Sequence, residues 1–263
     1  MSSPEIVISG DSALGLELAQ LCSERGYAVR YLRPGRIQPL LPSGTLVLRE
    51  PAEAAGADAV FLTAIHPRRS FVASLQYLET QISPETAVVV SGFSSGPTAM
   101  GRHLRHPGRL FAFGAVPPLD RLKGIAIARG MLAQDRAFER VLSLAEALFG
   151  RSYQGPDAPG MTLPRVVATL VNEAAFALSE GVAQAPDIDR AMLLGVNYPE
   201  GPLAWGDRIG LEEVLACLQA LLEYYGESRY RAAPLLRRLV QAGFTGRLGG
   251  RGFYTYPGAE ARG

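Results

Sequence analysis

The sequence predicts an α/β domain with a mostly parallel sheet, followed by an all-α domain. In the first part of the chain, short apolar runs alternate with amphipathic segments, a pattern typical of a parallel sheet covered by helices. After Gln154-Gly155-Pro156, apolar residues recur at helical spacing only. We therefore expect one domain over residues 1–156 and a helical domain over residues 157–263.

Each strand expected in the first domain is a short apolar run bounded by polar or turn-forming residues. In chain order these runs are Glu5–Ser9, Val29–Leu32, Thr45–Leu48, Ala59–Thr63, Ala87–Ser91, Leu110–Phe113 and Ile125–Ile127. Amphipathic segments predict helices at Ala13–Arg25, 68–82, 97–105 and Arg136–Phe149. Two helices of the second domain are expected from apolar faces, one with Leu163, Val166, Val167, Leu170, Val171, Ala174 and Leu178, the other with Val214, Leu215, Leu218, Leu221, Leu222 and Tyr225.

Composition and charge exclude several classes of protein. The 263 residues are 48% hydrophobic, which is enough for a sizeable core, and 26 basic residues against 25 acidic ones leave a net charge of +1. Nucleic-acid binding is not expected, because such proteins carry a basic excess. No apolar stretch approaches the roughly 18 residues that span a bilayer, and Met1–Pro4 lacks the basic start of a signal peptide. We expect a cytoplasmic protein.

Two cysteines, Cys22 and Cys217, lie far apart in apolar helical segments. This placement indicates buried thiols in a reducing compartment rather than a disulfide. Neither cysteine belongs to a pattern with zinc-ligand spacing, so no metal site is expected.

A glycine-containing turn follows the first expected strand. Gly10 and Gly15 occupy the outer positions of a dinucleotide-binding turn, and Ser12 stands at the position of the middle glycine. The end of the second strand is followed by Arg33, which suits the 2′-phosphate of NADP, whereas a carboxylate there favours NAD. The functional interpretation is a cofactor site formed by Gly10, Ser12, Gly15 and Arg33. The alternative is that Asp11 or Ser12 caps the helix and Arg33 is a solvated loop charge.

The second domain carries a series of motifs in order. They are 187–192 (Asp-Ile-Asp-Arg-Ala-Met), 194–202 (Leu-Gly-Val-Asn-Tyr-Pro-Glu-Gly-Pro), Asp207, Gly210-Leu211, Gly246-Arg247 and 250–254 (Gly-Arg-Gly-Phe-Tyr). This series resembles the helical domain of the 3-hydroxyacyl-CoA dehydrogenases. Upstream, residues 157–160 resemble that family's interdomain segment, and Ser91–Ser95 resembles one of its strand ends.

A narrower resemblance extends over residues 197–199, 202–207, 225–227, 229–231 and 234–237. These segments are similar to the second half of phenylacetate-pathway 3-hydroxyacyl-CoA dehydrogenases, a reduced Rossmann-like unit followed by an all-α dimerisation domain. The resemblance implies NAD(P)-dependent oxidation of a 3-hydroxyacyl-CoA in fatty- or aromatic-acid catabolism. It also implies assembly as a homodimer or heteromer through the helical domain. The structural interpretation of the same motifs is a turn around Pro199 with Trp205 filling the core.

The resemblance also implies a catalytic set of four residues, a His–Glu pair for the base and a Ser and an Asn for the substrate. Only the serine has a counterpart here, Ser94. The expected histidine segment, residues 110–118, holds no histidine. The glutamate falls near Lys123 or Gly124, and the asparagine falls on Pro164.

One histidine offers a replacement for the base. His66 follows an expected strand at the carboxyl edge of the sheet, where ligands bind in open α/β folds. Its alternative is a solvated loop histidine, just as Arg68 and Arg69 either pair with CoA phosphates or face water. The family's helical excursion after the second strand is replaced here by a short Pro/Gly loop at 34–45.

Two main hypotheses follow from these residues. In the first, the chain is an NAD(P)-dependent dehydrogenase with an eroded site that uses Ser94 and His66. In the second, it is an inactive dimerising or scaffolding subunit that partners a complete dehydrogenase. An NADP-dependent reductase that keeps Arg33 as its phosphate contact is a third.

Overall fold

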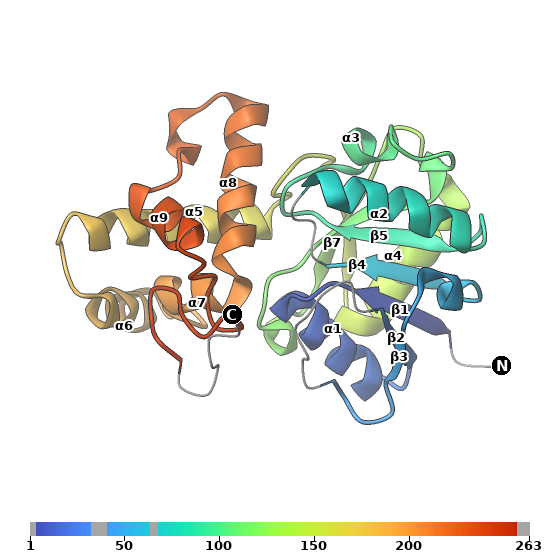
Figure 1. Cartoon of the computed structure of the whole chain (residues 1–263), viewed down its shortest axis with the longest axis horizontal. Helices are drawn as coiled ribbons and strands as arrows, with labels where there is room; N and C mark the ends of the chain where they lie inside the picture. Colours follow the sequence, from blue (N-terminus) through green and yellow to red (C-terminus); the bar gives the residue numbers. More distant parts are fainter. Residues whose placement is uncertain (1–3, 33–40, 64–67, 257–263) are drawn as a thin grey trace.

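The computed structural model describes residues 4–32, 41–63 and 68–256. It shows an α/β domain with the helical domain beside it (Figure 1). In the described part of the chain, no helix combines the length and the apolar character needed to cross a membrane.

One eight-stranded sheet organises the first domain within the described residues, with strand order β3-β2-β1-β4-β5-β6-β7-β8. All neighbouring strands are parallel except β6 and β7, which are antiparallel. The first six strands follow the order of a Rossmann fold, which confirms the expected class. The strands are β1 (Glu5–Ser9), β2 (Ala28–Leu32), β3 (Leu46–Leu48), β4 (Ala59–Leu62), β5 (Ala87–Ser91), β6 (Leu110–Gly114), β7 (Ile125–Arg129) and β8 (Ser152–Gly155).

Strand β8 is the one strand that the sequence did not predict. Its side chains are half-buried or exposed because it forms the edge of the sheet, so it lacks the continuous apolar run of the other strands.

Helices cover both faces of the sheet. The helices α1 (Ala13–Glu24) and α4 (Asp135–Phe149) pack on the face that includes Ile8 and Phe111. The helices α2 (Arg68–Gln81) and α3 (Pro97–Gly101) pack on the face that includes Val7 and Val90. Helix α3 is shorter than the expected 97–105. Three 3-10 turns complete the domain, η1 (Pro51–Ala54), η2 (Pro107–Arg109) and η3 (Leu119–Arg121).

The second domain is helical throughout its described part. Its helices are α5 (Leu163–Ser179), α6 (Ala185–Val196), α7 (Pro202–Ile209), α8 (Leu211–Tyr225) and α9 (Pro234–Gln241), with a 3-10 turn η4 (Ser228–Tyr230). The core forms around Val171, Trp205 and Leu218, as the apolar faces of α5 and α8 predict. Three expected face residues are instead exposed, Val166 of α5 at 51% and Leu222 and Tyr225 of α8 at 36% each.

The connection between the domains is tied to the end of β5. The Gly160 amide donates to the carbonyl oxygens of Gly92 and Phe93, at 2.8 and 3.0 Å. The Asp157 carboxylate accepts from the Thr98 amide at 3.1 Å. Helix α5 therefore begins beside the strand end that carries Ser94.

Candidate functional site

The glycine-containing turn lies at the point where the strand order reverses. In a doubly wound sheet this point, between β1 and β4, is where nucleotides bind. Here Ser12, the residue that caps α1, has a buried hydroxyl that accepts from the Gly15 amide at 3.2 Å. The same hydroxyl donates to Thr63, which follows β4, at 3.2 Å. The Ser12 hydroxyl is therefore hydrogen-bonded to one backbone amide in the first turn of α1. Amides at this position of a helix bind phosphate in dinucleotide sites.

The outer glycines fit the tight packing that such a turn needs. A Cβ on Gly15 would lie 2.6 Å from Thr63 Oγ1 and 2.8 Å from the Tyr31 hydroxyl, so a larger residue would force helix and strand apart. The Tyr31 hydroxyl donates to the Gly10 carbonyl oxygen, and Gly10 has a positive φ of 135°. The turn thus fits a dinucleotide at its two ends and departs from that fit at Ser12.

The other two predicted ligand residues cannot be placed in this site. Arg33 and His66 both lie outside the described residues, and the side chains of Arg68 and Arg69 are not described either. Ser94 is described, and it is buried just beyond the carboxyl end of β5. The structure therefore brings Gly10, Ser12 and Gly15 together. Ser94 lies three residues beyond the end of β5, which is separated from β1 by β4.

The segment where the resemblance implies a histidine includes the end of β6, and a pair of small residues joins this strand end to β7. Gly114, the last residue of β6, lies directly opposite Ala126 of β7. Lys123 and Gly124, where the resemblance implies the glutamate, lie just before β7 begins, and the Lys123 side chain is exposed.

Met161 fills the space beside this pair. Its buried side chain lies so close to three glycines that a Cβ on Gly92 would be 2.2 Å from its Sδ, and a Cβ on Gly155 2.8 Å from its Cε. A Cβ on Gly114 would be 3.4 Å from the same side chain. The end of the β6–β7 pair is therefore packed with an apolar thioether.

The position implied for a substrate-binding asparagine is Pro164, which is buried in the first turn of α5. Proline has no polar side chain and no backbone N–H, so it cannot replace an asparagine. Two turns further on, Asn172 donates to the Arg231 carbonyl at 3.1 Å and accepts from the Ala233 amide at 2.8 Å. Asn172 therefore joins α5 to the segment before α9.

The two acidic motif residues Asp189 and Asp207 of the second domain make structural contacts. Asp189 of α6 accepts from the amides of Leu203 and Ala204, at 2.7 and 2.9 Å, and thus caps the N-terminus of α7. It also accepts from the Tyr254 hydroxyl at 2.8 Å. Gly201 is needed here because a Cβ would lie 2.2 Å from the Asp189 Cβ.

Asp207 holds the C-terminal segment in the same way. Its carboxylate accepts from the amides of Phe253 and Tyr254, both at 2.9 Å, and from the Tyr256 hydroxyl at 3.0 Å. Burial raises the pKa of Asp207, and these hydrogen bonds oppose that rise. The motif residues therefore shape the domain, which supports their structural interpretation.

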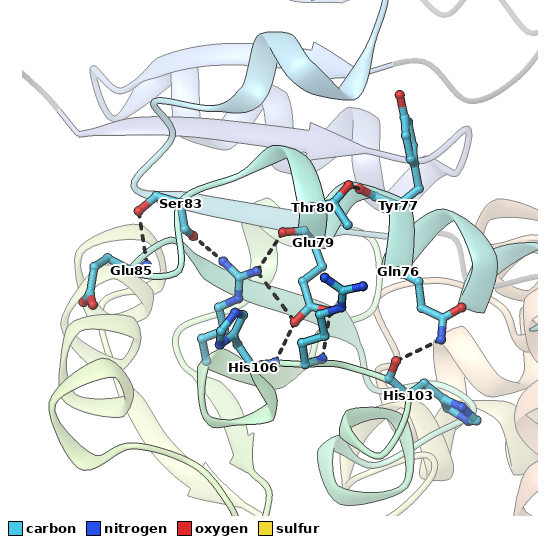
Figure 2. A network of polar contacts seen from close by, with 10 residues as sticks. Gln76, Tyr77, Glu79, Thr80, Ser83, Glu85, His103 and His106 are labelled. Carbon is cyan, nitrogen blue, oxygen red and sulfur yellow. Dashed lines mark hydrogen bonds and ion pairs between the residues drawn. The ribbon is translucent and has the colours of Figure 1, made fainter.

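A buried ion pair braces the loop before β6 (Figure 2). The Arg109 guanidinium lies 3.8 Å from the Glu79 carboxylate, and both side chains are almost fully buried. Glu79 also accepts from the amides of Arg105 and His106, at 2.9 and 2.7 Å. Burial lowers the pKa of Arg109, and the Glu79 charge opposes this. His106 is exposed, and its backbone is part of this brace.

A cavity of about 780 Å³ opens at the opposite edge of the sheet, at the amino ends of β4 and β5. Two of the polar groups on its wall bond to neighbouring backbone. The Asp58 carboxylate accepts from the Glu5 amide at 2.7 Å, and the Thr86 hydroxyl donates to the Ala57 carbonyl at 2.7 Å. This cavity is therefore separate from the glycine turn and from Ser94.

Metal and thiol chemistry find no support in residues 4–32, 41–63 and 68–256. No group of three or more His, Cys, Asp or Glu residues there could hold a metal ion. Cys22 and Cys217 are free and buried, as the sequence predicts. Burial raises the pKa of Cys22 to about 12 and raises the pKa of Cys217 as well, so both are thiols at neutral pH.

The fold and the site define a class of protein, a two-domain relative of the dinucleotide-dependent dehydrogenases. The family model for the 3-hydroxyacyl-CoA dehydrogenase C-terminal domain matches residues 160–256. A 3-hydroxybutyryl-CoA dehydrogenase of Bradyrhizobium diazoefficiens is 32% identical over 78% of this chain and 70% of its own length. The chain therefore belongs to the 3-hydroxyacyl-CoA dehydrogenase family.

Two further relatives extend this finding. A probable 3-hydroxybutyryl-CoA dehydrogenase of Bacillus subtilis is 29% identical over 97% of this chain and 98% of its own length. The 3-hydroxyadipyl-CoA dehydrogenase of Escherichia coli K12 is 42% identical over 130 residues, which are 48% of this chain and 27% of that protein. This match supports the phenylacetate-pathway resemblance.

Solved structures share the fold along nearly the whole chain. FadB2 of M. tuberculosis superposes with a TM-score of 0.79 at 20% identity, covering 97% of this chain and 100% of that one. The (S)-3-hydroxybutyryl-CoA dehydrogenase of Ralstonia eutropha superposes with a TM-score of 0.73 at 24% identity, covering 97% and 99%. At these identities the likeness establishes the fold alone.

Proposed function

We propose that this family member is a dimerising or scaffolding subunit with little dehydrogenase activity of its own, which partners a complete 3-hydroxyacyl-CoA dehydrogenase. The observation that carries the proposal is the packing of Met161 beside Gly114 and Ala126. Oxidation of a 3-hydroxyacyl thioester needs a base for the hydroxyl proton, and a positioned base contributes about 10²–10⁴ in rate. The end of the β6–β7 pair offers two small residues and a thioether instead.

Assembly through the helical domain is supported by its exposed apolar side chains. On α6, Leu194 and Val196 are 76% and 52% exposed, and Val182, just before this helix, is 71% exposed. Exposed apolar side chains of this kind are found at protein–protein contacts. We therefore assign the end of α6 with Leu193, Leu194 and Val196, named the α6 face, to contact with a second copy or with a complete dehydrogenase.

The ligands of the proposed assembly are an acyl-CoA and NAD or NADP. The acyl-CoA is inferred from the names of the relatives, which act on 3-hydroxybutyryl-CoA and 3-hydroxyadipyl-CoA. Gly10 and Gly15 preserve the packing of a nucleotide turn, whereas Ser12 competes for one of its amides. We expect weak cofactor binding by this chain, and a cytoplasmic role in fatty- or aromatic-acid catabolism.

An NAD(P)-dependent dehydrogenase is the second candidate. It is favoured by the full-length similarity to the Bacillus subtilis relative, a probable 3-hydroxybutyryl-CoA dehydrogenase, and by the retained Ser94 beyond β5. In this candidate Ser94 contacts the substrate and His66 serves as the base.

One titration separates the two candidates. The purified chain is titrated with NADH, NADPH and acetoacetyl-CoA, and reduction is followed by loss of absorbance at the nicotinamide band. The subunit proposal predicts weak or absent binding and no reduction above background. Turnover that is lost in Ser94→Ala or His66→Ala would establish the enzyme instead.

The assembly is tested separately by light scattering after size exclusion. Leu194→Asp on the α6 face is expected to abolish self-association or capture by a complete dehydrogenase. Met131→Asp is the matched control, because Met131 is 87% exposed on the other domain. Equal behaviour of the two variants would reject the α6 face as the interface.

A further inference from the structure

Helix α7 reaches from the helical domain to the first helix of the α/β domain. The Arg208 guanidinium on α7 contacts Glu17 Oε1 on α1 with two nitrogens. Its Nε donates at 2.9 Å, and its Nη2 lies at 2.8 Å. The third guanidinium nitrogen, Nη1, pairs with the carboxylate of Glu200, which lies just before α7. The side chains of Arg208 and Glu17 are each only 24% exposed, so solvent screens this interdomain pair less than a surface pair.

The same carboxylate organises the loop after β6. Glu17 Oε2 accepts from the Leu119 amide at 2.8 Å. Two residues earlier in this loop, the Pro117 carbonyl accepts from the Trp205 indole of α7. Trp205 and Arg208 lie one turn apart on α7, so a single helix face contacts both the loop and α1.

The position of Glu17 gives this contact a consequence for ligand access. Glu17 follows Gly15 by two residues, so the pair closes the interdomain boundary beside the glycine turn. The segment at 156–160 connects the domains covalently, and Phe93 and Val116 of the α/β domain pack into the helical core, so the Arg208–Glu17 pair adds a polar contact to an apolar one. Partly buried charges that pair across a domain boundary favour the closed arrangement without any ligand present.

We propose that Arg208 and Glu17 form an electrostatic latch that holds the helical domain against the glycine-turn helix and that opens when the pair is broken. The latch does not require the chain to be catalytic. It acts in a subunit that binds a partner as well as in an enzyme that admits a ligand between its domains.

The test uses Arg208→Met and Glu17→Gln on the full chain. Methionine keeps the length of the apolar stem without the charge, and glutamine keeps an acceptor for the Leu119 amide. Hydrogen exchange is measured for the peptides that contain α1 and Leu119, and small-angle scattering is recorded in 0.05 and 1 M salt. The latch predicts about tenfold faster exchange in these peptides and a larger radius of gyration in both variants. Wild type in 1 M salt should move in the same direction.

Arg229→Met is the matched control. Arg229 pairs with Glu227 within the helical domain, and these side chains are 60% and 48% exposed. This variant should match wild type in both measurements. The latch is refuted if Arg208→Met exchanges and scatters like wild type. It is also refuted if only Arg208→Met opens while Glu17→Gln and high salt do not, because packing rather than charge would then hold the domains. If Arg208→Met fails to fold, Glu17→Gln and the salt series decide the question.

Discussion

Gly114 lies directly opposite Ala126 at the end of the antiparallel β6–β7 pair. Both residues are buried, and Met161 from the interdomain segment packs beside them. In this chain the end of the β6–β7 pair forms part of the core. The fold of the family is therefore retained, and in this chain the end of the β6–β7 pair is packed with apolar atoms.

Met161 packs closely against Gly92, so substitutions at these two residues should have coupled effects on stability. Gly92→Ala should lower the free energy of unfolding by about 1–3 kcal/mol, because the new Cβ would meet the Met161 side chain. The cost should shrink in a Met161→Ala background, which urea unfolding of the four variants of a double-mutant cycle measures. Gly195→Ala is the control, because nothing lies within 4 Å of its Cβ position. Full additivity would show that Met161 does not fill this space.

Ser12 should control the affinity of the turn for dinucleotides. Ser12→Gly removes the hydroxyl that accepts from Gly15, and we expect NADH or NADPH to bind about tenfold more tightly, the worth of about one hydrogen bond. The cost in stability should be only a few tenths of a kcal/mol, because glycine is tolerated at an N-cap. Ser12→Ala also frees the Gly15 amide but keeps the Cβ in the turn, so it should lose about 1 kcal/mol of stability and gain less affinity than Ser12→Gly. Calorimetric titration measures the affinities, and unchanged binding by Ser12→Gly would contradict this role.

Tyr254 and Tyr256 predict a loss of stability in alkali. Burial, and then the bonds to Asp189 and Asp207, raise the pKa of both hydroxyls above the value in the unfolded chain. The folded state therefore retains these protons longer than the unfolded state. Their contribution is fully present below pH about 10 and is lost as the pH rises further.

Phenylalanine substitutions test this dependence. Tyr254→Phe with Tyr256→Phe should lower stability at pH 8 by about 1–3 kcal/mol, because two hydrogen bonds are lost. The same double variant should lose less stability than wild type between pH 9 and 11. Melting temperatures across this range measure both effects, with Tyr153→Phe, on the sheet edge, as the control. Parallel pH profiles for wild type and the double variant would reject the assignment.

The two thiols should be unreactive in the folded protein. Cys22 and Cys217 are both buried, and burial raises their pKa values, so the reactive thiolate is scarce at pH 8. Alkylation followed by mass spectrometry should detect no modified cysteine in native buffer and two in denaturant. Rapid native labelling would show that these helices open locally.

The strands of the sheet were predictable because their signal is local. Buried parallel strands are continuous apolar runs, and β1 and β5 were predicted to the residue. The edge strand β8 has no such run, so its pairing with β7 appears only in three dimensions. Val166 follows the apolar spacing of α5 yet lies exposed, because the pattern cannot show which neighbours the fold brings to a face.

The sequence predicted which residues belong to the candidate site, but it did not predict which residues contact one another there. The capping alternative for Ser12 is confirmed by its bond to Gly15, whereas its bond to Thr63 joins residues 51 positions apart and left no signal in the sequence. The facing of Gly114 and Ala126 depends on strand register, and the placement of Met161 depends on the path of the interdomain segment. These are long-range relationships, and a single sequence does not encode them as a readable pattern.

The most direct test of the proposed function is the reduction of acetoacetyl-CoA by the purified chain with NADH or NADPH. The packing of Met161 beside Gly114 and Ala126 predicts turnover at least about 10²-fold below that of a complete family dehydrogenase assayed in parallel. Comparable turnover that disappears in Ser94→Ala or His66→Ala would contradict the subunit role and establish an enzyme with a replacement base.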